Sequence, residues 1–222
     1  VRTVLASGGG DQKQVSVLQL INAHRFLGTR WAQLDPLKRT ERPDIHELEL
    51  SHYGFTEADL NETFNTGSFH GLPSDRATLR EILDAVRQTY CGSIGAEYMY
   101  MTDIGEKRWI QARLEPNRGK PLFDATKQRR ILERLTAAET MERYLHTKYV
   151  GQKRFSLEGG ESTIPFLDCI IETGCELSAN QFVMGMAPRG RLKVLTNIFG
   201  KKPEYIFTEF EGRPSEDGLF DG

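Results

Sequence analysis

The 222-residue sequence is poor in cysteine, in net charge and in long apolar runs. Its 3 cysteines (Cys91, Cys169 and Cys175) show no Cys-x-x-Cys spacing, which argues against a disulfide framework or a structural zinc site. We expect them to be small buried thiols in a reducing compartment. Lys and Arg number 29 against 31 Asp and Glu, so no overall charge attracts the chain to nucleic acid.

Other signals are missing as well. The 5 histidines have no metal-ligand spacing. No apolar run approaches the roughly 20 residues that a membrane span needs. The sequence contains no Walker loop, dinucleotide fingerprint, nucleophile elbow or HExxH motif. The segment VRTVLASGGGDQ is a poor secretory signal, and we interpret residues 1–14 as a disordered or frayed end. These absences leave a water-soluble globular protein as the expectation.

A mainly helical region is predicted for residues 15–150. Apolar side chains recur at helical spacing between Val15 and Phe26, which predicts a first helix there. Residues 38–73 are polar and mixed, and we expect a loop-rich stretch with short helices. The clearest helix covers residues 79–90, because its apolar positions recur at i, i+3, i+4, i+7 and i+11.

Further helices follow in this region. Residues 106–115 are predicted to be helical with Trp109 facing inward. Asp124 is predicted to cap a longer helical stretch. Thr136-Ala137-Ala138-Glu139 matches a capping box inside that stretch, so we expect it to break into two helices there. Thr56 is expected to cap one of the short helices upstream.

The pattern changes at residue 151. We expect a loop at residues 153–160, a helix at 163–173 and a short buried strand at 181–186. A helix at 190–199 and a further helix from 203 onward are expected to follow. Helix, strand, helix is typical of an open α/β domain, but one strand cannot bury both its faces or pair its own edges. The predicted fold class is therefore α/β with an incomplete sheet.

Two arginines, Arg189 and Arg191, follow the predicted strand. Ligands of open α/β folds bind at the carboxyl ends of strands, and the N–H groups at a helix start attract anions. Arginine forks hold carboxylates and phosphates bidentately, and Arg154 with Ser156 would add a third guanidinium and a hydroxyl. The pattern predicts an anion-binding edge. It leaves open that these arginines are only solvated charges that compensate nearby glutamates.

Several long motifs stand in order along the chain. They are WAQLDPL (31–37), ETFNTGSF (62–69), TYCGSIGAEYMYMTD (89–103), EKRWIQARLE (106–115), TAAETMERYLHTKYVGQKRFSLEGGESTIP (136–165) and GMAPRGRLKVLTNIFGKKPEYIFTEFEG (185–212). In this order they resemble the first, thiamine-diphosphate-dependent component of 2-oxoglutarate dehydrogenase. The resemblance implies a helical N-terminal region that leads, at residues 151–222, into the first part of a thiamine-diphosphate-binding α/β domain.

The resemblance also implies an activity. Such enzymes use thiamine diphosphate and Mg²⁺ to decarboxylate 2-oxoglutarate, and pass the succinyl unit to a lipoyl group on a partner succinyltransferase in the tricarboxylic acid cycle. A homodimer, in the bacterial cytoplasm or the mitochondrial matrix, is implied as well. A substrate with two carboxylates needs cationic clamps, so we expect Arg154, Ser156, Arg189 and Arg191 to contribute to the substrate and cofactor pocket. Glu158 is expected to orient an arginine.

Two features depart from the family pattern. The family's His-Arg-Gly-Arg motif reads Pro188-Arg189-Gly190-Arg191 here, so a catalytic donor or proton relay is replaced by a residue without a ring nitrogen or an N–H. The Gly-Asp-Gly motif of the Mg²⁺–diphosphate site, followed by its Asn, does not occur. We therefore expect the polypeptide alone to be inactive. The alternative is a non-catalytic truncated paralogue that acts as an interaction module.

Overall fold

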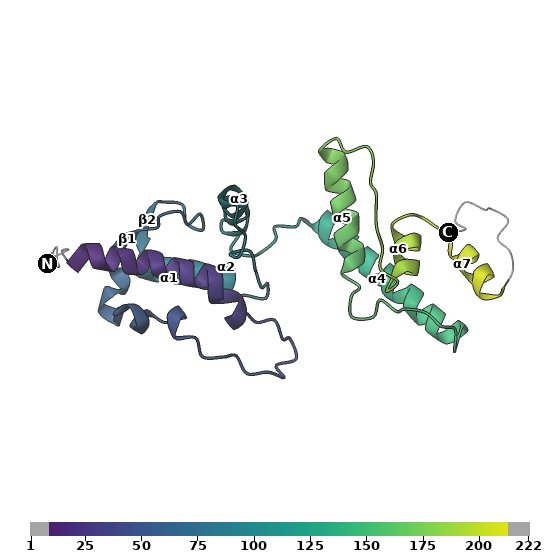
Figure 1. Ribbon diagram of the computed structural model, residues 1–222, viewed down its shortest axis with the longest axis horizontal. Helices are drawn as coiled ribbons and strands as arrows, with labels where there is room; N and C mark the ends of the chain where they lie inside the picture. The colour runs from purple at the N-terminus through teal and green to yellow at the C-terminus, as the bar shows by residue number, and fades with distance from the viewer. Residues whose placement is uncertain (1–8, 213–222) are drawn as a thin grey trace. The chain divides into compact units, whose positions relative to one another are not determined.

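The computed structural model describes residues 9–212, and the chain divides into two compact units, Val1–Leu122 and Phe123–Gly222 (Figure 1). The first unit contains α1 (Gly9–Trp31), the 3₁₀ helices η1 (His46–Leu48), η2 (Leu50–Tyr53) and η3 (Glu57–Asn61), β1 (Thr63–Asn65), β2 (Arg76–Thr78), α2 (Leu79–Tyr90) and α3 (Ile104–Leu114). The second contains α4 (Ala125–Lys148), α5 (Thr163–Glu176), α6 (Arg191–Asn197) and α7 (Pro203–Phe210).

Helix α1 is longer than predicted at both ends. Residues 9–14, expected to be frayed, are helical, while residues 1–8 lie outside the described chain. Long-range contacts hold this first part: Lys13 Nζ lies 2.6 Å from Asp59 Oδ1, and the Gln14 amide exchanges two hydrogen bonds with the backbone of Asn65. These contacts are formed only in the folded chain, so local periodicity does not reveal them.

Gly28 lies inside α1 rather than at its end. A Cβ at this position would lie 2.6 Å from Tyr90 Cβ, so glycine allows α1 to approach α2 closely here. The two helices lie side by side in Figure 1. The prediction for α2 is confirmed, and its first turn carries a capping box in which Thr78 Oγ1 accepts from Glu81 N while the Glu81 carboxylate accepts from Thr78 N.

The core of the first unit forms between α1, α2 and the short β1–β2 hairpin. The strands pair antiparallel with Phe64 opposite Ala77. The fully or nearly buried members include Val17, Leu20, Ile21, Phe64, Leu79, Ile82, Val86, Tyr90 and Tyr98. The predicted inward position of Trp109 is wrong, since that ring is 57% exposed and lies under the guanidinium of Arg113. Around this core, β1 and β2 form the only sheet in the described part of the chain.

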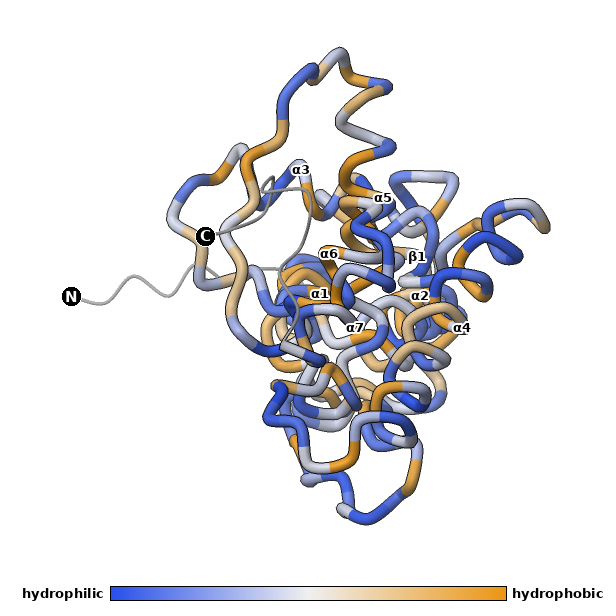
Figure 2. Tube along the Cα trace, turned by 90° about the vertical axis from the view of Figure 1, so that its right-hand side faces the viewer, coloured by the Kyte–Doolittle hydropathy of each residue, from blue (hydrophilic) through white to orange (hydrophobic). Residues whose placement is uncertain are grey.

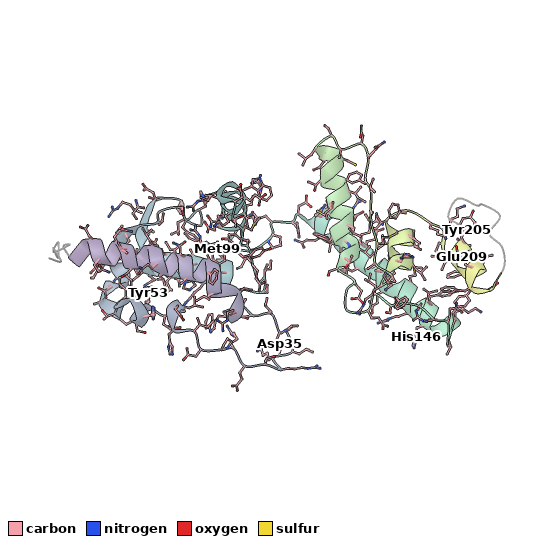
Figure 3. The ribbon with its side chains drawn as sticks, in the orientation of Figure 1. Asp35, Tyr53, Met99, His146, Tyr205 and Glu209 are labelled. Carbon is pink, nitrogen blue, oxygen red and sulfur yellow. The ribbon has the colours of Figure 1, made fainter. Side chains whose placement is uncertain are left out.

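Acidic side chains hold the loops and turns of this unit by accepting hydrogen bonds from backbone N–H groups. The carboxylate of Asp35, labelled in Figure 3, accepts hydrogen bonds from the backbone N–H groups of Leu37, Arg39 and Thr40, so a charged group holds the loop after α1. The prediction that Thr56 precedes a short helix is confirmed, with the Asp59 carboxylate accepting from its backbone N–H at 2.7 Å. Side-chain acceptors of this kind fix turns that carry little apolar burial.

Helix α4 is continuous, so the predicted break at residues 136–139 is wrong. Thr136 Oγ1 donates to the carbonyl of Leu132 one turn earlier at 2.8 Å instead of capping a new helix. The predicted cap at Asp124 is confirmed, since its side chain accepts from Lys127 N. Arg130 pairs with Asp168 through Nε at 2.7 Å, and this ion pair ties α4 to α5.

The predicted buried strand at residues 181–186 is wrong. The backbone there has no strand partner in the second unit as far as it is described. Met184 and Met186 pack against a small core of Ala138, Leu157, Ile164 and Val194, whereas Val183, directly before Met184, is fully exposed. The segment has the alternation of a strand without the ladder that defines one. The fold is mixed and mainly helical, with an incomplete sheet.

Three further observations concern membrane spans, metal clusters and the cysteines. None of the helices between residues 9 and 212 is long and apolar enough to cross a membrane. Among the same residues, no cluster of three or more His, Cys, Asp and Glu side chains could hold a metal ion. The prediction of buried thiols is confirmed for Cys91, but Cys169 is half-buried and Cys175 is exposed.

Candidate functional site

Two loops of the second unit meet beside α4 and α6, and the motif arginines lie there. The N–H of Gly190 donates to the carbonyl of Phe155 at 3.0 Å. Arg189 donates from Nε to the carbonyl of Ser156 at 3.0 Å and from Nη2 to the carbonyl of Glu158 at 2.9 Å. The structure thus brings together the two separate stretches that the motifs singled out.

A close backbone approach makes this meeting possible. Gly190 has a φ of 77°, in the left-handed region, and lies directly before α6. A Cβ added at this position would lie 2.5 Å from Leu157 Cδ1. Glycine is therefore required here both for its conformation and for the space beside Leu157.

The charged centre of the site is the carboxylate of Glu142, which projects from α4. Its Oε1 lies 3.0 Å from Nε of Arg154, and its Oε2 lies 2.8 Å from Nζ of Lys193. Glu142 is 4% exposed and Lys193 is 2% exposed. Burial raises the pKa of the Glu142 carboxyl, but the neighbouring cations Lys193 and Arg154, together with the polar side chain of Ser156, outweigh it, so the pKa lies below its usual value.

The Lys193 contact is an ion pair without good hydrogen-bond geometry. Although Nζ is close to the carboxylate, it has no partner in the described chain that satisfies the angles of a hydrogen bond. The short distance makes the contact a charge–charge interaction, and the hydrogens of an ammonium group rotate freely. Lys193 is therefore a buried cation whose donors are incompletely used.

The other predicted site residues differ in their surroundings. Arg154 and Ser156 are half-buried, while Pro188, Arg189 and Arg191 are exposed. Within the described residues, the side chain of Arg191 makes no hydrogen bond or ion pair. The structure thus places Arg189 against the loop that carries Arg154 and Ser156, whereas Arg191 makes no such contact among the described residues.

Two expectations about this region need correction. Glu158 holds an arginine, but through its backbone carbonyl and not through its carboxylate. The start of α6 is not an open cradle for anions, because the N–H of Arg191 donates to the carbonyl of Pro188, and those of Lys193 and Val194 donate to that of Gly190.

Glu142 and Lys193 were not predicted as site residues, although the sequence contains a weak signal for each. Glu142 falls between Ala138 and Leu145 at helical spacing, and both of these side chains are buried. Lys193 stands between Leu192 and Val194 at the apolar start of α6. A charged residue at an otherwise apolar position of a helix indicates a buried ion pair, but its partner cannot be read from the sequence.

No family model matches the chain. Curated relatives, however, match it over nearly its whole length. It is 51% identical over 98% of its residues to the 2-oxoglutarate dehydrogenase E1 component of Cupriavidus necator, and 46% identical over 96% to that of Azotobacter vinelandii. The chain is related to 2-oxoglutarate dehydrogenase E1 components. The protein of this name from Haemophilus influenzae is 46% identical over 97% of the chain, which confirms the resemblance stated from the motifs.

The match covers only part of the length of each relative. The chain spans 23% of the Cupriavidus necator E1 component, 22% of the Azotobacter vinelandii one and 23% of that from Haemophilus influenzae. Similarity to E1 components therefore extends along this chain, while most of each relative has no counterpart in it.

Proposed function

We propose that this chain forms part of a 2-oxoglutarate dehydrogenase E1 component, and that residues 151–222 open its thiamine-diphosphate-binding domain. The whole protein would decarboxylate 2-oxoglutarate in the tricarboxylic acid cycle and transfer the succinyl unit to a lipoyl group on a succinyltransferase partner. A homodimer is proposed for the intact protein. Because the relatives named above are bacterial, a cytoplasmic location is favoured over the mitochondrial matrix.

One observation supports a ligand-binding role most directly. Arg189 bonds to the carbonyls of Ser156 and Glu158, so the cationic segment after residue 187 and the Arg154–Ser156 loop form one surface. Neither acceptor is charged, so the positive charge of Arg189 is not neutralised by these bonds. Guanidinium groups with a neighbouring hydroxyl suit a carboxylate or a phosphate.

This donor set fits the anionic parts of the proposed ligands. Arg154, Ser156 and Arg189 would hold a carboxylate of 2-oxoglutarate or the diphosphate of thiamine diphosphate. When bound, thiamine diphosphate supplies the electron sink for decarboxylation. Residues 9–212 contain no cluster of three or more His, Cys, Asp and Glu side chains for Mg²⁺, and the sequence lacks the family's Gly-Asp-Gly motif, so we propose that other parts of the whole protein supply its ligands.

A second candidate function is that of a non-catalytic interaction module. It is supported by Pro188 at the position of the family's histidine, and by apolar side chains left exposed on the second unit. Apolar positions recur along α5 in Figure 2, and Phe166 and Ile170 on that helix are 64% and 45% exposed. Such side chains on a folded surface are typical of contact with another protein.

Isolating the natural polypeptide with an antibody against this chain would distinguish the two proposed functions. We expect a polypeptide well above 25.2 kDa that releases CO₂ from 2-oxoglutarate when thiamine diphosphate and Mg²⁺ are supplied. In that protein, Arg154→Gln should raise the KM for 2-oxoglutarate about tenfold. Arg143→Gln serves as the control, because Arg143 is an exposed α4 residue whose one ion pair among residues 9–212 is with Glu139. A polypeptide near 25.2 kDa without turnover would support the interaction module instead.

A further inference from the structure

The buried charges around Glu142 do not balance. One carboxylate contacts two cations, Arg154 and Lys193, and the side chains of all three are at most 14% exposed. Counting only the groups in contact, the cluster carries one excess positive charge. An uncompensated charge in a poorly hydrated place costs several kcal/mol of solvation, so such clusters occur where another charge completes them.

The excess charge is located on the outer side of the cluster, at Arg154. Lys193 is almost completely buried, whereas Arg154 lies in the loop that Arg189 covers and keeps some contact with solvent. Arg154 uses only Nε toward Glu142, and its two terminal amino groups have no partner in residues 9–212. A planar guanidinium with one edge occupied and the other free is preorganised for a second oxyanion.

Lys193 explains why that edge stays free. Without a second cation, both oxygens of Glu142 would be available to Arg154, and the pair would be neutral and bidentate. With Lys193 on Oε2, Glu142 holds Arg154 only through Oε1 and Nε. Lys193 therefore compensates the negative charge of the Glu142 carboxylate, and that carboxylate positions Arg154.

We infer that Glu142, Lys193 and Arg154 form an anion site whose charges balance when an oxyanion is bound: Lys193 neutralises Glu142, Glu142 orients Arg154, and Arg154 with the Ser156 hydroxyl binds a carboxylate or a phosphate. Lys193 and Glu142 are positioning residues that act through Arg154. The existence of the site follows from the charges alone. Its assignment to a substrate carboxylate or to the cofactor diphosphate rests on the proposed function.

The charge count gives opposite predictions for two variants. Lys193→Met leaves Glu142 and Arg154 as a neutral pair, so binding of an anion should weaken by about tenfold or more. Glu142→Gln keeps the shape of the side chain and leaves two cations, so binding should strengthen. A purely structural role predicts that both variants weaken binding, because both remove a buried ion pair.

The test is isothermal titration calorimetry on the full polypeptide that carries this sequence, with 2-oxoglutarate and inorganic diphosphate as separate probes at constant ionic strength. Lys148→Met is the matched control, since Lys148 is exposed at the end of α4 and its loss should leave the affinity unchanged. Opposite shifts for Lys193→Met and Glu142→Gln with either probe support the inference. The probe that shows them identifies the site as one for carboxylate or for diphosphate.

Three results would overturn the inference: no binding of either probe, equal weakening by both variants, or an affinity that neither variant changes. If Lys193→Met does not fold, Glu142→Gln alone decides, since stronger binding supports the inference and weaker or unchanged binding contradicts it. Opposite changes in affinity in a polypeptide without decarboxylase activity would support the anion site and contradict the proposed function. The two proposals can therefore fail separately.

Discussion

Arg25 on α1 and Glu115 at the end of α3 form a buried ion pair, with Nε 2.8 Å from Oε1 and side chains 3% and 0% exposed. The hydroxyl of Tyr90 donates to the same carboxylate oxygen at 2.6 Å, and the N–H of His70 donates to the other at 2.7 Å. Both carboxylate oxygens are thus satisfied, and one charged group joins α1, α2 and α3. The pair fixes the positions of these helices within the first unit.

Removal of this carboxylate should destabilise the first unit strongly. We expect Glu115→Ala to lower the free energy of unfolding by about 3–5 kcal/mol, because Arg25 would remain buried without its counter-charge. Glu106→Ala, at an exposed position of α3, is the control and should change stability by less than about 1 kcal/mol. Urea unfolding followed by circular dichroism measures both. A loss for Glu115→Ala no larger than that of the control would contradict this account.

His24 should make the first unit sensitive to acid. Its ring is fully buried, Nδ1 is 2.9 Å from the carbonyl of Leu20, and Nε2 has no partner among residues 9–212. Burial is the main cause that lowers the pKa of His24 to about 4, opposed by the Leu20 hydrogen bond and assisted by the charge of Arg87. The unfolded chain therefore takes up this proton at a higher pH than the folded one.

The direction in which stability changes with pH follows from the difference in the pKa of His24 between the folded and the unfolded chain. The contribution of His24 to stability is fully present above its unfolded pKa near 6.5 and is lost as the pH falls toward 4, by up to about 3 kcal/mol. His24→Gln should flatten this part of the curve of unfolding free energy against pH. The exposed His146 provides the control, and His146→Gln should leave the slope unchanged. An equally steep slope in His24→Gln would show that another group is responsible.

Gly190→Ala should disrupt the meeting of the two site loops. A residue other than glycine at positive φ costs about 1–2 kcal/mol, and the clash with Leu157 should add about 1–3 kcal/mol. Gly200 provides a matched control because it has a φ of 72°, while a Cβ added there would have no atom within 4 Å. Thermal melting of both variants separates the two costs. Equal losses for Gly190→Ala and Gly200→Ala would mean that the clash relaxes freely.

Pro188→His should raise turnover in the whole polypeptide while leaving the fold intact. Pro188 is exposed and precedes α6, and its carbonyl accepts from Arg191 N at 3.3 Å, a bond that a histidine backbone can also make. A positioned acid–base group contributes about 10²–10⁴ in rate, so we expect a gain of about tenfold or more in kcat. Steady-state CO₂ release measures it, with Pro188→Ala as the control. Equal kcat values for the two variants would refute the role assigned to this position.

Local sequence patterns predicted helices that carry their own signals, although the capping box at residues 136–139 wrongly predicted a break in α4. The periodicity and capping residues of α2 are sufficient to place it, as is Asp124 for the start of α4. Predictions were wrong where a distant partner decides the structure. The first turns of α1 depend on Asp59 and Asn65, and the segment 181–186 has strand periodicity without a strand to pair with. Pairing partners and tertiary anchors are properties of the folded chain that a window of sequence does not contain.

The candidate site was predicted in part for the same reason. The motifs identified Arg154, Ser156 and Arg189, since these residue types are the ones that oxyanions require. Glu142 and Lys193 were missed because they stand far apart in sequence and resemble ordinary helical residues. Their importance comes from their burial together and from the distances of 3.0 Å and 2.8 Å that join three charges.

The close packing of Gly190 against Leu157 also limits the order in which this region can change over evolution. A smaller residue at position 157 would remove the overlap at 2.5 Å that a larger side chain at position 190 meets, but the cost of the positive φ at position 190 would remain. The reverse order, in which position 190 changes first, passes through a destabilised intermediate. Substitutions at these positions should therefore be contingent on one another, and the loop that carries Arg154 and Ser156 should diverge more slowly than its exposure alone would suggest.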